Sequence, residues 1–294
     1  MKKIKTCLIS VFYKTNLDKI VALLKEQGVQ IYATGGTYDF IKDLDDSVKT
    51  IESLTTYPSI LGGRVKTLHP KVFGGILGRL QNEKDVEEMK QYEIPAFDLV
   101  IVDLYPFEET VKKTDDPAQI IEKIDIGGIS LIRAGAKNFN EVVIVPDSKY
   151  YLEFMELYKN QDGCTSIEDR KRFAKYAFAT SSHYDGMIYD WFAKDDDTSD
   201  LNIHIDSRSE LRYGENPHQK ATFYGNLDDV FEKLHGKDLS YNNLLDLEAG
   251  LNLIREFDEP TFAILKHNNP CGIASRTTIA EAYQAALAGD PVSA

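Results

Sequence analysis

Short apolar runs alternate with segments of helical periodicity along the first two thirds of the chain. The run over residues 4–12 predicts a strand, and the period over residues 17–27 predicts a helix that Asn16 caps and Gly28 ends. Further strands are predicted over residues 29–34, 98–104 and 141–145. Continuous apolar strands, such as DLVIVDL at 98–104, are typical of parallel sheets buried on both faces. The pattern predicts an α/β fold with a mostly parallel sheet.

Helices are expected between and after these strands. One follows Thr34, and another begins with Asp116 as N-cap and Pro117 as the first helical residue. Three more are expected over residues 150–158, 167–179 and 187–192.

The stretch over residues 193–202 (AKDDDTSDLN) is acidic and lacks apolar periodicity. We therefore expect domains over residues 1–199 and 200–294. The second begins a new series, with a strand expected over residues 261–265 and a helix over residues 278–287.

Composition narrows the class of protein. A length of 294 residues suits two domains, and a net charge of −13 argues against a surface that binds nucleic acid or anionic membranes through its general field. The N-terminal apolar run is too short for a signal peptide, and no stretch is long enough to span a membrane. Three distant cysteines and six histidines lack the spacing of disulfide frameworks or metal sites. We expect a cytoplasmic, reduced protein without a catalytic metal.

One stretch departs from the acidic average. Asp and Glu number 47, about one residue in six, yet residues 53–82 contain neither. The stretch holds five glycines, His69 and four cations, which are Arg64, Lys66, Lys71 and Arg79. A glycine-rich cationic loop is suited to phosphate, since its N–H groups approach an anion closely. The alternative is a solvated basic loop.

Two other segments could contribute to the same phosphate site. Thr34-Gly35-Gly36-Thr37 lies where a strand passes into a helix, and a helix N-terminus favours phosphate, although a tight turn explains the glycines as well. Ser10 and Lys14 follow the first strand. In open α/β sheets the carboxyl ends of strands bind ligands, so these strand ends are expected to converge.

Acid–base candidates follow other predicted elements. Asp103, Tyr105, Asp125 and Lys137 suit proton transfer, yet each has a plain alternative as a helix cap, a packed aromatic residue or a solvated cation. In the second domain, Lys266 and His267 precede two asparagines, an arrangement suited to acyl transfer. The alternative is a histidine that bonds the backbone at a strand end.

Seven phrases together resemble the bifunctional AICAR transformylase/IMP cyclohydrolase family of purine biosynthesis. They are ATGGT, LGGRVKTLHPKVFGGIL, VDLYPFEETV, EKIDIGGISLIRAGAKN, LRYGENPHQKA, LSYNNLLDLEA and KHNNPCG. The resemblance implies a methylglyoxal-synthase-like N-terminal domain followed by the leading part of a cytidine-deaminase-like α/β transformylase domain. It also implies a chain truncated within the second domain, with cyclohydrolase activity and without transformylase activity.

The resemblance assigns residues to two reactions. In closure of the formylated ribotide FAICAR to IMP, Lys66 would stabilise an oxyanion, Lys137 would transfer protons, and Tyr105 and Asp125 would orient the substrate, with no cofactor. The implied ribotide contacts are Ser10, Phe12, Tyr13, Lys14, Thr34, Gly35, Gly36, Thr37, Arg64, Val65, Lys66, Thr67, Val102, Asp103, Asp125 and Ile126.

In the second domain Arg212, Tyr213 and His267 would contact ribotide, and Lys266 with His267 would transfer formyl from the co-substrate 10-formyltetrahydrofolate. The resemblance also implies a homodimer.

Two departures from the family pattern bear on binding. The usual SVSDK reads Ser10-Val11-Phe12-Tyr13-Lys14 here, and Asp103 replaces the usual Asn. We expect backbone contacts to persist and substrate affinity to change. The competing hypothesis is a non-catalytic regulatory module that binds a phosphorylated metabolite, and nucleic-acid binding is a more distant alternative.

Overall fold

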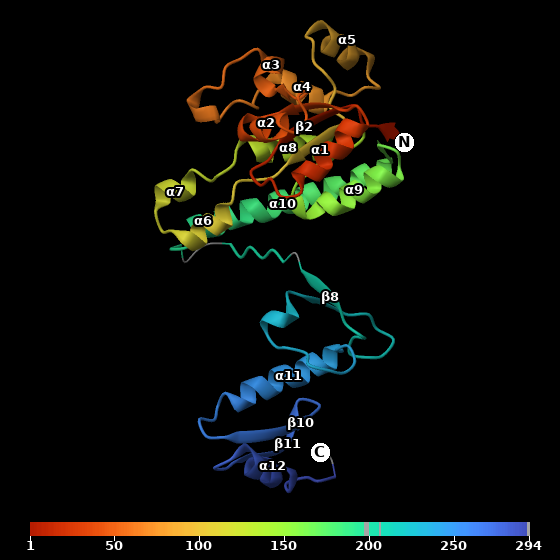
Figure 1. The fold of residues 1–294 in the computed structure, drawn as a ribbon. Coiled ribbons are helices and arrows are strands. Elements are labelled where there is room, and N and C mark those ends of the chain that lie inside the picture. Colours follow the sequence, from red (N-terminus) through yellow and green to blue (C-terminus); the bar gives the residue numbers. More distant parts are fainter. Residues whose placement is uncertain (197–199, 206, 293–294) are drawn as a thin grey trace. The chain divides into compact units, whose positions relative to one another are not determined.

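The chain forms two compact units in the computed structural model, which describes residues 1–196, 200–205 and 207–292. Unit 1 is Met1–His204 and unit 2 is Ile205–Ala294 (Figure 1). The predicted boundary at 193–202 lies beside this division, although residues 197–199 fall outside the described ranges. No helix of the described residues is long and apolar enough to cross a membrane.

Unit 1 is built on a five-stranded parallel sheet with the strand order β4-β3-β2-β5-β6. Its strands are β4 (Lys49–Thr50), β3 (Gln30–Ala33), β2 (Thr6–Ser10), β5 (Leu99–Val102) and β6 (Val143–Val145). The predicted strands and the parallel α/β class are confirmed. The chain builds outward from β2 in one direction and then from β5 in the other, so the order reverses between β2 and β5. In open α/β sheets this switch point is where ligands bind.

Helices cover both faces of the sheet because successive side chains of a strand point to opposite sides. In β2, Cys7 and Ile9 belong to one core and Leu8 to the other. The first core is completed by α1 (Leu17–Glu26), α2 (Gly35–Lys42) and α9 (Tyr151–Asn160), and the second by α3 (Ile51–Thr55), α4 (Pro70–Leu77) and α8 (Gly127–Lys137). The long helix α10 (Ile167–Phe192) contributes to both cores.

Two helix predictions need correction. The segments predicted as separate helices at 167–179 and 187–192 form the single 26-residue helix α10. The intervening Ser181, Tyr184 and Gly186 are buried, so packing outweighs the weak helix propensity of this segment. Asn16 precedes α1 as predicted but does not cap it, because its backbone is left-handed and its side chain accepts a hydrogen bond from Lys19.

Smaller elements complete unit 1. Asp116 caps α7 (Pro117–Ile121) as predicted, through a hydrogen bond from the Ala118 N–H. The others are β1 (Lys2–Lys3), β7 (Cys164–Thr165), α5 (Glu83–Gln91), α6 (Phe107–Lys113), and the short 3₁₀ turns Leu61–Gly63 and Ser148–Tyr150.

Unit 2 contains two antiparallel hairpins and two helices. The first hairpin pairs β8 (Arg208–Glu210) with β9 (Thr222–Tyr224), and the second pairs β10 (Thr261–Lys266) with β11 (Asn269–Ser275). The helices are α11 (Tyr241–Ile254) and α12 (Ile279–Leu287), and a 3₁₀ turn spans Leu227–Asp229. Buried Ala282 and Ala286 pack α12 on the second hairpin. The predicted strand at 261–265 and helix at 278–287 are confirmed.

Candidate functional site

The carboxyl ends of β2 and β3 are joined by hydroxyl groups. The Ser10 and Thr34 hydroxyl oxygens lie 2.8 Å apart. The Thr37 hydroxyl accepts from the Val11 N–H (3.1 Å) and donates to the Val11 carbonyl (2.9 Å). These bonds place the start of α2 beside the turn that follows β2, as expected from the sequence.

The same turn is bonded to the end of β5. The Asp103 carboxylate accepts from the Phe12 N–H with one oxygen and from the Tyr13 N–H with the other, the second at 3.0 Å. The Lys14 ammonium donates to the carbonyls of Val11 (2.6 Å) and Phe12 (2.9 Å). Burial lowers the pKa of Lys14, and the charge of Asp103 opposes that shift.

The loop over residues 64–67 lies beside the first residues of two helices. A Cβ atom on Gly35, at the start of α2, would lie 3.0 Å from the Lys66 Nζ. A Cβ atom on Gly127, at the start of α8, would lie 2.7 Å from the Thr67 Oγ1. The first N–H groups of a helix have no partner within it and favour anions. The loop thus adds its charge beside the first N–H groups of α2, whereas Asp125 already accepts from the Gly128 N–H of α8.

Lys66 differs from the other cations of the acid-free stretch. Arg64 pairs with Glu122, Lys71 with Glu93 (3.8 Å) and Arg79 with Asp85 (2.7 Å). Lys66 forms no ion pair with any residue that the structure describes. Its ammonium is therefore available to an anionic ligand.

The charge of Lys66 acts on Asp125, and the charge of Asp125 acts on Tyr105. One Asp125 oxygen accepts from the Gly128 N–H in the first turn of α8 at 2.5 Å, although the N-cap position of that helix is Ile126. Burial raises the pKa of Asp125, while hydrogen bonds and the charge of Lys66 oppose the rise. Burial and the Asp125 charge raise the pKa of Tyr105, keeping its hydroxyl protonated at neutral pH.

Two further residues belong to this surface and were missed in the sequence. The Lys123 ammonium lies 5.7 Å from the Tyr105 ring centre and 5.9 Å from that of Phe12, within cation–π range. The Tyr184 hydroxyl accepts from the Asp125 N–H at 2.9 Å. Lys123 lies inside the phrase EKIDIGG, which offered a signal, whereas Tyr184 follows Asp125 by 59 positions on α10 and offered none.

Lys137 is not brought to this group within the chain. It ends α8, which runs away from Asp125 for 11 residues, about 16 Å of helix. The next strand, β6, begins at Val143 opposite Leu99, the first residue of β5. Lys137 therefore lies at the amino edge of the sheet, and its role in proton transfer stays a prediction.

Three other residues expected to contact the ribotide differ in how exposed their side chains are. The Val102 side chain is buried in the core, which leaves only its backbone for the site. Val65 is half-buried, and Ile126 is exposed.

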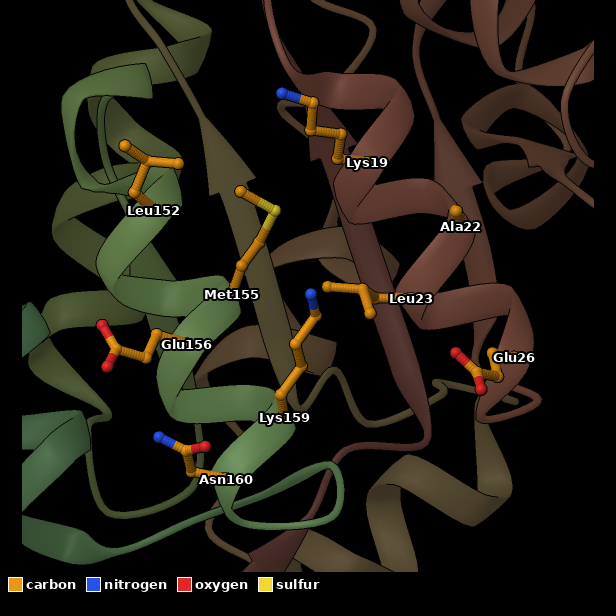
Figure 2. A pocket seen from close by; sticks show the side chains of 9 residues that line it. All are labelled: Lys19, Ala22, Leu23, Glu26, Leu152, Met155, Glu156, Lys159 and Asn160. Atoms are coloured by element: carbon orange, nitrogen blue, oxygen red, sulfur yellow. The ribbon is translucent and has the colours of Figure 1, made fainter.

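A separate groove of about 580 Å³ lies between α1 and α9. Figure 2 shows Leu23 and Met155 facing each other across it, with Lys159 reaching into the space. None of its lining residues belongs to the predicted site, and both positive and negative side chains line it. The chemistry at the switch point is therefore the better functional candidate.

In unit 2 the predicted acyl-transfer pair lies at a hairpin turn. Lys266 ends β10, and the turn residues His267 and Asn268 both have positive φ values of 53° and 64°, as a type I′ turn requires. The Asn268 N–H donates to the Asp246 carboxylate of α11 at 2.7 Å. Lys266 and His267 are thus consecutive residues at this turn, and both are exposed.

Arg212 and Tyr213 lie near the first residues of α11. The Arg212 guanidinium stacks 4.9 Å from the Tyr213 ring centre. Hydrogen bonds from Ser240 and Arg212 lower the pKa of Tyr213. Among the described residues of either unit, no group of three or more His, Cys, Asp or Glu side chains is arranged to hold a metal ion.

Comparisons with known proteins agree with this architecture. Residues 16–130 match the MGS-like domain model, and residues 135–294 match the model described as AICARFT/IMPCHase bienzyme. The structure "Crystal structure of ForH" resembles the chain with a TM-score of 0.56 and 35% identity, over 64% of this chain and 99% of that one.

Curated relatives extend the match to the whole chain. The "Bifunctional purine biosynthesis protein PurH" of Bacteroides thetaiotaomicron is 56% identical over 293 residues, covering 100% of this chain and 58% of the relative. The protein of the same name from Rhodospirillum rubrum is 44% identical over 299 residues, covering 99% of this chain and 57% of the relative. The chain thus spans a little under three fifths of the length of these relatives. By its match over more than half of its residues, it belongs to the AICARFT/IMPCHase bienzyme family.

Proposed function

We propose that unit 1 catalyses the dehydrating closure of FAICAR to IMP in purine biosynthesis. The observation that carries this proposal is the grouping of Lys66, Tyr105 and Asp125 at the carboxyl edge of the sheet, beside the first residues of α2 and α8. A site that only binds phosphate needs helix N-termini and cations, but it does not need proton-transfer groups such as Tyr105 and Asp125. The family membership supports the same reaction.

The ribotide phosphate would bind where donors converge. The start of α2 supplies N–H groups, and Ser10 and Thr34 supply hydroxyls. The exposed rings of Phe12 and Tyr105, which are 43% and 44% exposed, offer apolar surface to the planar base.

Ring closure joins the carboxamide nitrogen to the formyl carbon. The new C–N bond turns the formyl oxygen into an oxyanion, which the Lys66 ammonium would stabilise and protonate. The carboxamide nitrogen loses one proton and the formamide nitrogen loses the other, and the former formyl oxygen departs as water. Asp125 and Tyr105 would fix the carboxamide against the formyl carbon and accept or return protons during these steps. This closure needs no cofactor.

Formyl transfer from 10-formyltetrahydrofolate is the reaction that the family resemblance assigns to residues of unit 2. Lys266 and His267 share one turn, but both are exposed. We propose that these 294 residues convert FAICAR to IMP but do not, by themselves, transfer a formyl group to the ribotide. A homodimer, a cytoplasmic location and small ribotides as the ligands are proposed on the family membership.

The direct test is incubation of the purified chain with FAICAR, with IMP measured by chromatography. We expect many turnovers per molecule. Tight ribotide binding without IMP would instead support the regulatory module and overturn the assignment as an enzyme.

A further inference from the structure

The carboxylate at the sheet's switch point has an unusual pair of bonds. Asp103 follows β5 and is 8% exposed. Each of its oxygens accepts from a different backbone N–H of the neighbouring turn, those of Phe12 and Tyr13. A side chain with one acceptor oxygen cannot reproduce this pairing.

Burial makes the ionised form of Asp103 unfavourable, so keeping it charged lowers the stability of the folded chain. Burial raises the pKa of Asp103 to about 6, while the two N–H bonds and Lys14 pull in the other direction. A buried residue that titrates this close to neutrality suits a role in function better than one in folding.

Among the described residues, Asp103 supplies the only acceptors for the N–H groups of Phe12 and Tyr13. Lys14 bonds the carbonyls of Val11 and Phe12, so it fixes the opposite side of the same peptides. We propose that the Asp103 carboxylate is a positioning residue, which holds the turn over residues 11–14 in the shape that binds the ribotide by using one oxygen for each amide. This inference rests on the proposed function.

Protonation would undo the pairing. A protonated carboxyl has a hydroxyl that donates, so one of the two amides loses its acceptor. The turn should loosen as the pH falls through about 6, where Asp103 gains its proton.

Other ionisable groups face Asp103 and must be separated from it. Those whose charges act on it or that line the adjoining cavity of about 200 Å³ are Tyr13, Lys14, Tyr105, Glu108, Glu109, Asp147, Tyr151, His183 and Tyr184. Histidines in general titrate in the same pH range, so His183→Gln is the matched control for Asp103→Asn.

The first experiment observes the amide directly, without any ligand. Phe precedes Tyr only at Phe12-Tyr13 and Phe223-Tyr224. Labelling Phe with ¹³C at its carbonyl and Tyr with ¹⁵N therefore selects two amides, of which Tyr224 in unit 2 is an internal control. We expect the Tyr13 amide to titrate near pH 6 in the wild type and in His183→Gln, and to stay constant in Asp103→Asn. A Tyr13 amide that does not titrate, or that titrates equally in Asp103→Asn, would overturn the proposal.

The second experiment measures FAICAR turnover against pH. Asp103→Asn keeps the size of the side chain but has one acceptor oxygen. At pH 8 we expect its KM to exceed that of the wild type about tenfold, the effect of losing one charged hydrogen bond, with kcat within about threefold. The KM ratio should approach one at pH 5, and the substrate phosphate's own titration cancels in this ratio. A pH-independent ratio would contradict the inference.

The two experiments separate two kinds of failure. A wild-type chain that neither binds nor converts FAICAR refutes the proposed function, whereas the amide titration still reports on Asp103. Circular dichroism of Asp103→Asn at both pH values checks that the variant is folded.

Discussion

Lys66 shows how far single residues can be predicted from the sequence. The absence of acids over residues 53–82 predicted an anion site in that stretch. Which of its cations remains unpaired was not predictable, because Glu122, Glu93 and Asp85 come from outside the stretch and pair with Arg64, Lys71 and Arg79. Spatial neighbours, rather than local composition, leave Lys66 available.

Asp103 leads to a prediction about stability. Its pKa is about 6 in the folded chain, against 3.8 for an unperturbed Asp. The native state then keeps a proton that the unfolded state has already released between about pH 4 and 6. The free energy of unfolding should therefore fall as pH rises through this window, by at most about 3 kcal/mol.

Urea unfolding of the wild type and Asp103→Asn at pH 4.5 and 7.5 measures this effect. Between the two pH values, the wild type should lose stability relative to Asp103→Asn. Equal changes in both proteins would show that the folded-state pKa of Asp103 is not raised.

At the scale of elements, local sequence signals predicted where helices begin better than they predicted how far a helix continues. Asp116, Ser166 and Thr278 each cap a helix through a bond to a backbone N–H. The predicted break inside α10 was wrong, since the segment around Ser181 and Tyr184 is held helical by burial against the core of unit 1. Packing partners distant in the sequence carry no local signal.

The cap of α10 gives a second prediction. The Ser166 hydroxyl accepts from the Asp169 N–H at 3.0 Å, and the Asp169 carboxylate accepts from the Ser166 N–H at 2.9 Å. Ser166→Ala should lower the free energy of unfolding by about 1 kcal/mol. Ser182→Ala, at an exposed position inside the same helix, is the control and should change it by less than about 0.5 kcal/mol. Equal effects in urea unfolding would contradict the role of the cap.

At the scale of the molecule, the sequence predicted a parallel sheet but not its order. Strand order β4-β3-β2-β5-β6 places Ser10, the last residue of β2, beside the end of β5, which Asp103 follows, although Asp103 comes 93 positions after Ser10 in the chain. The same topology separates Asp125 from Lys137, because α8 runs back to the opposite edge. Residues of one sequence motif need not be close in the fold, because strand order determines which residues lie next to each other.

The division into units predicts where activity lies. Lys66, Tyr105 and Asp125 all belong to unit 1, Met1–His204. A chain ending at His204 should fold and close FAICAR with a kcat within about twofold of the 294-residue chain. Circular dichroism and IMP production test this, and a folded but inactive fragment would show that unit 2 contributes to the reaction.

The central claim is that ring closure depends on Lys66 at the switch-point site. The most direct measurement is kcat for FAICAR closure by Lys66→Ala, with Lys71→Ala as a control, since Lys71 comes from the same stretch but pairs with Glu93. Loss of an oxyanion-stabilising group should lower kcat by about 10²- to 10³-fold, whereas Lys71→Ala should retain it within about twofold. A Lys66→Ala chain that turns over like the wild type would contradict the account.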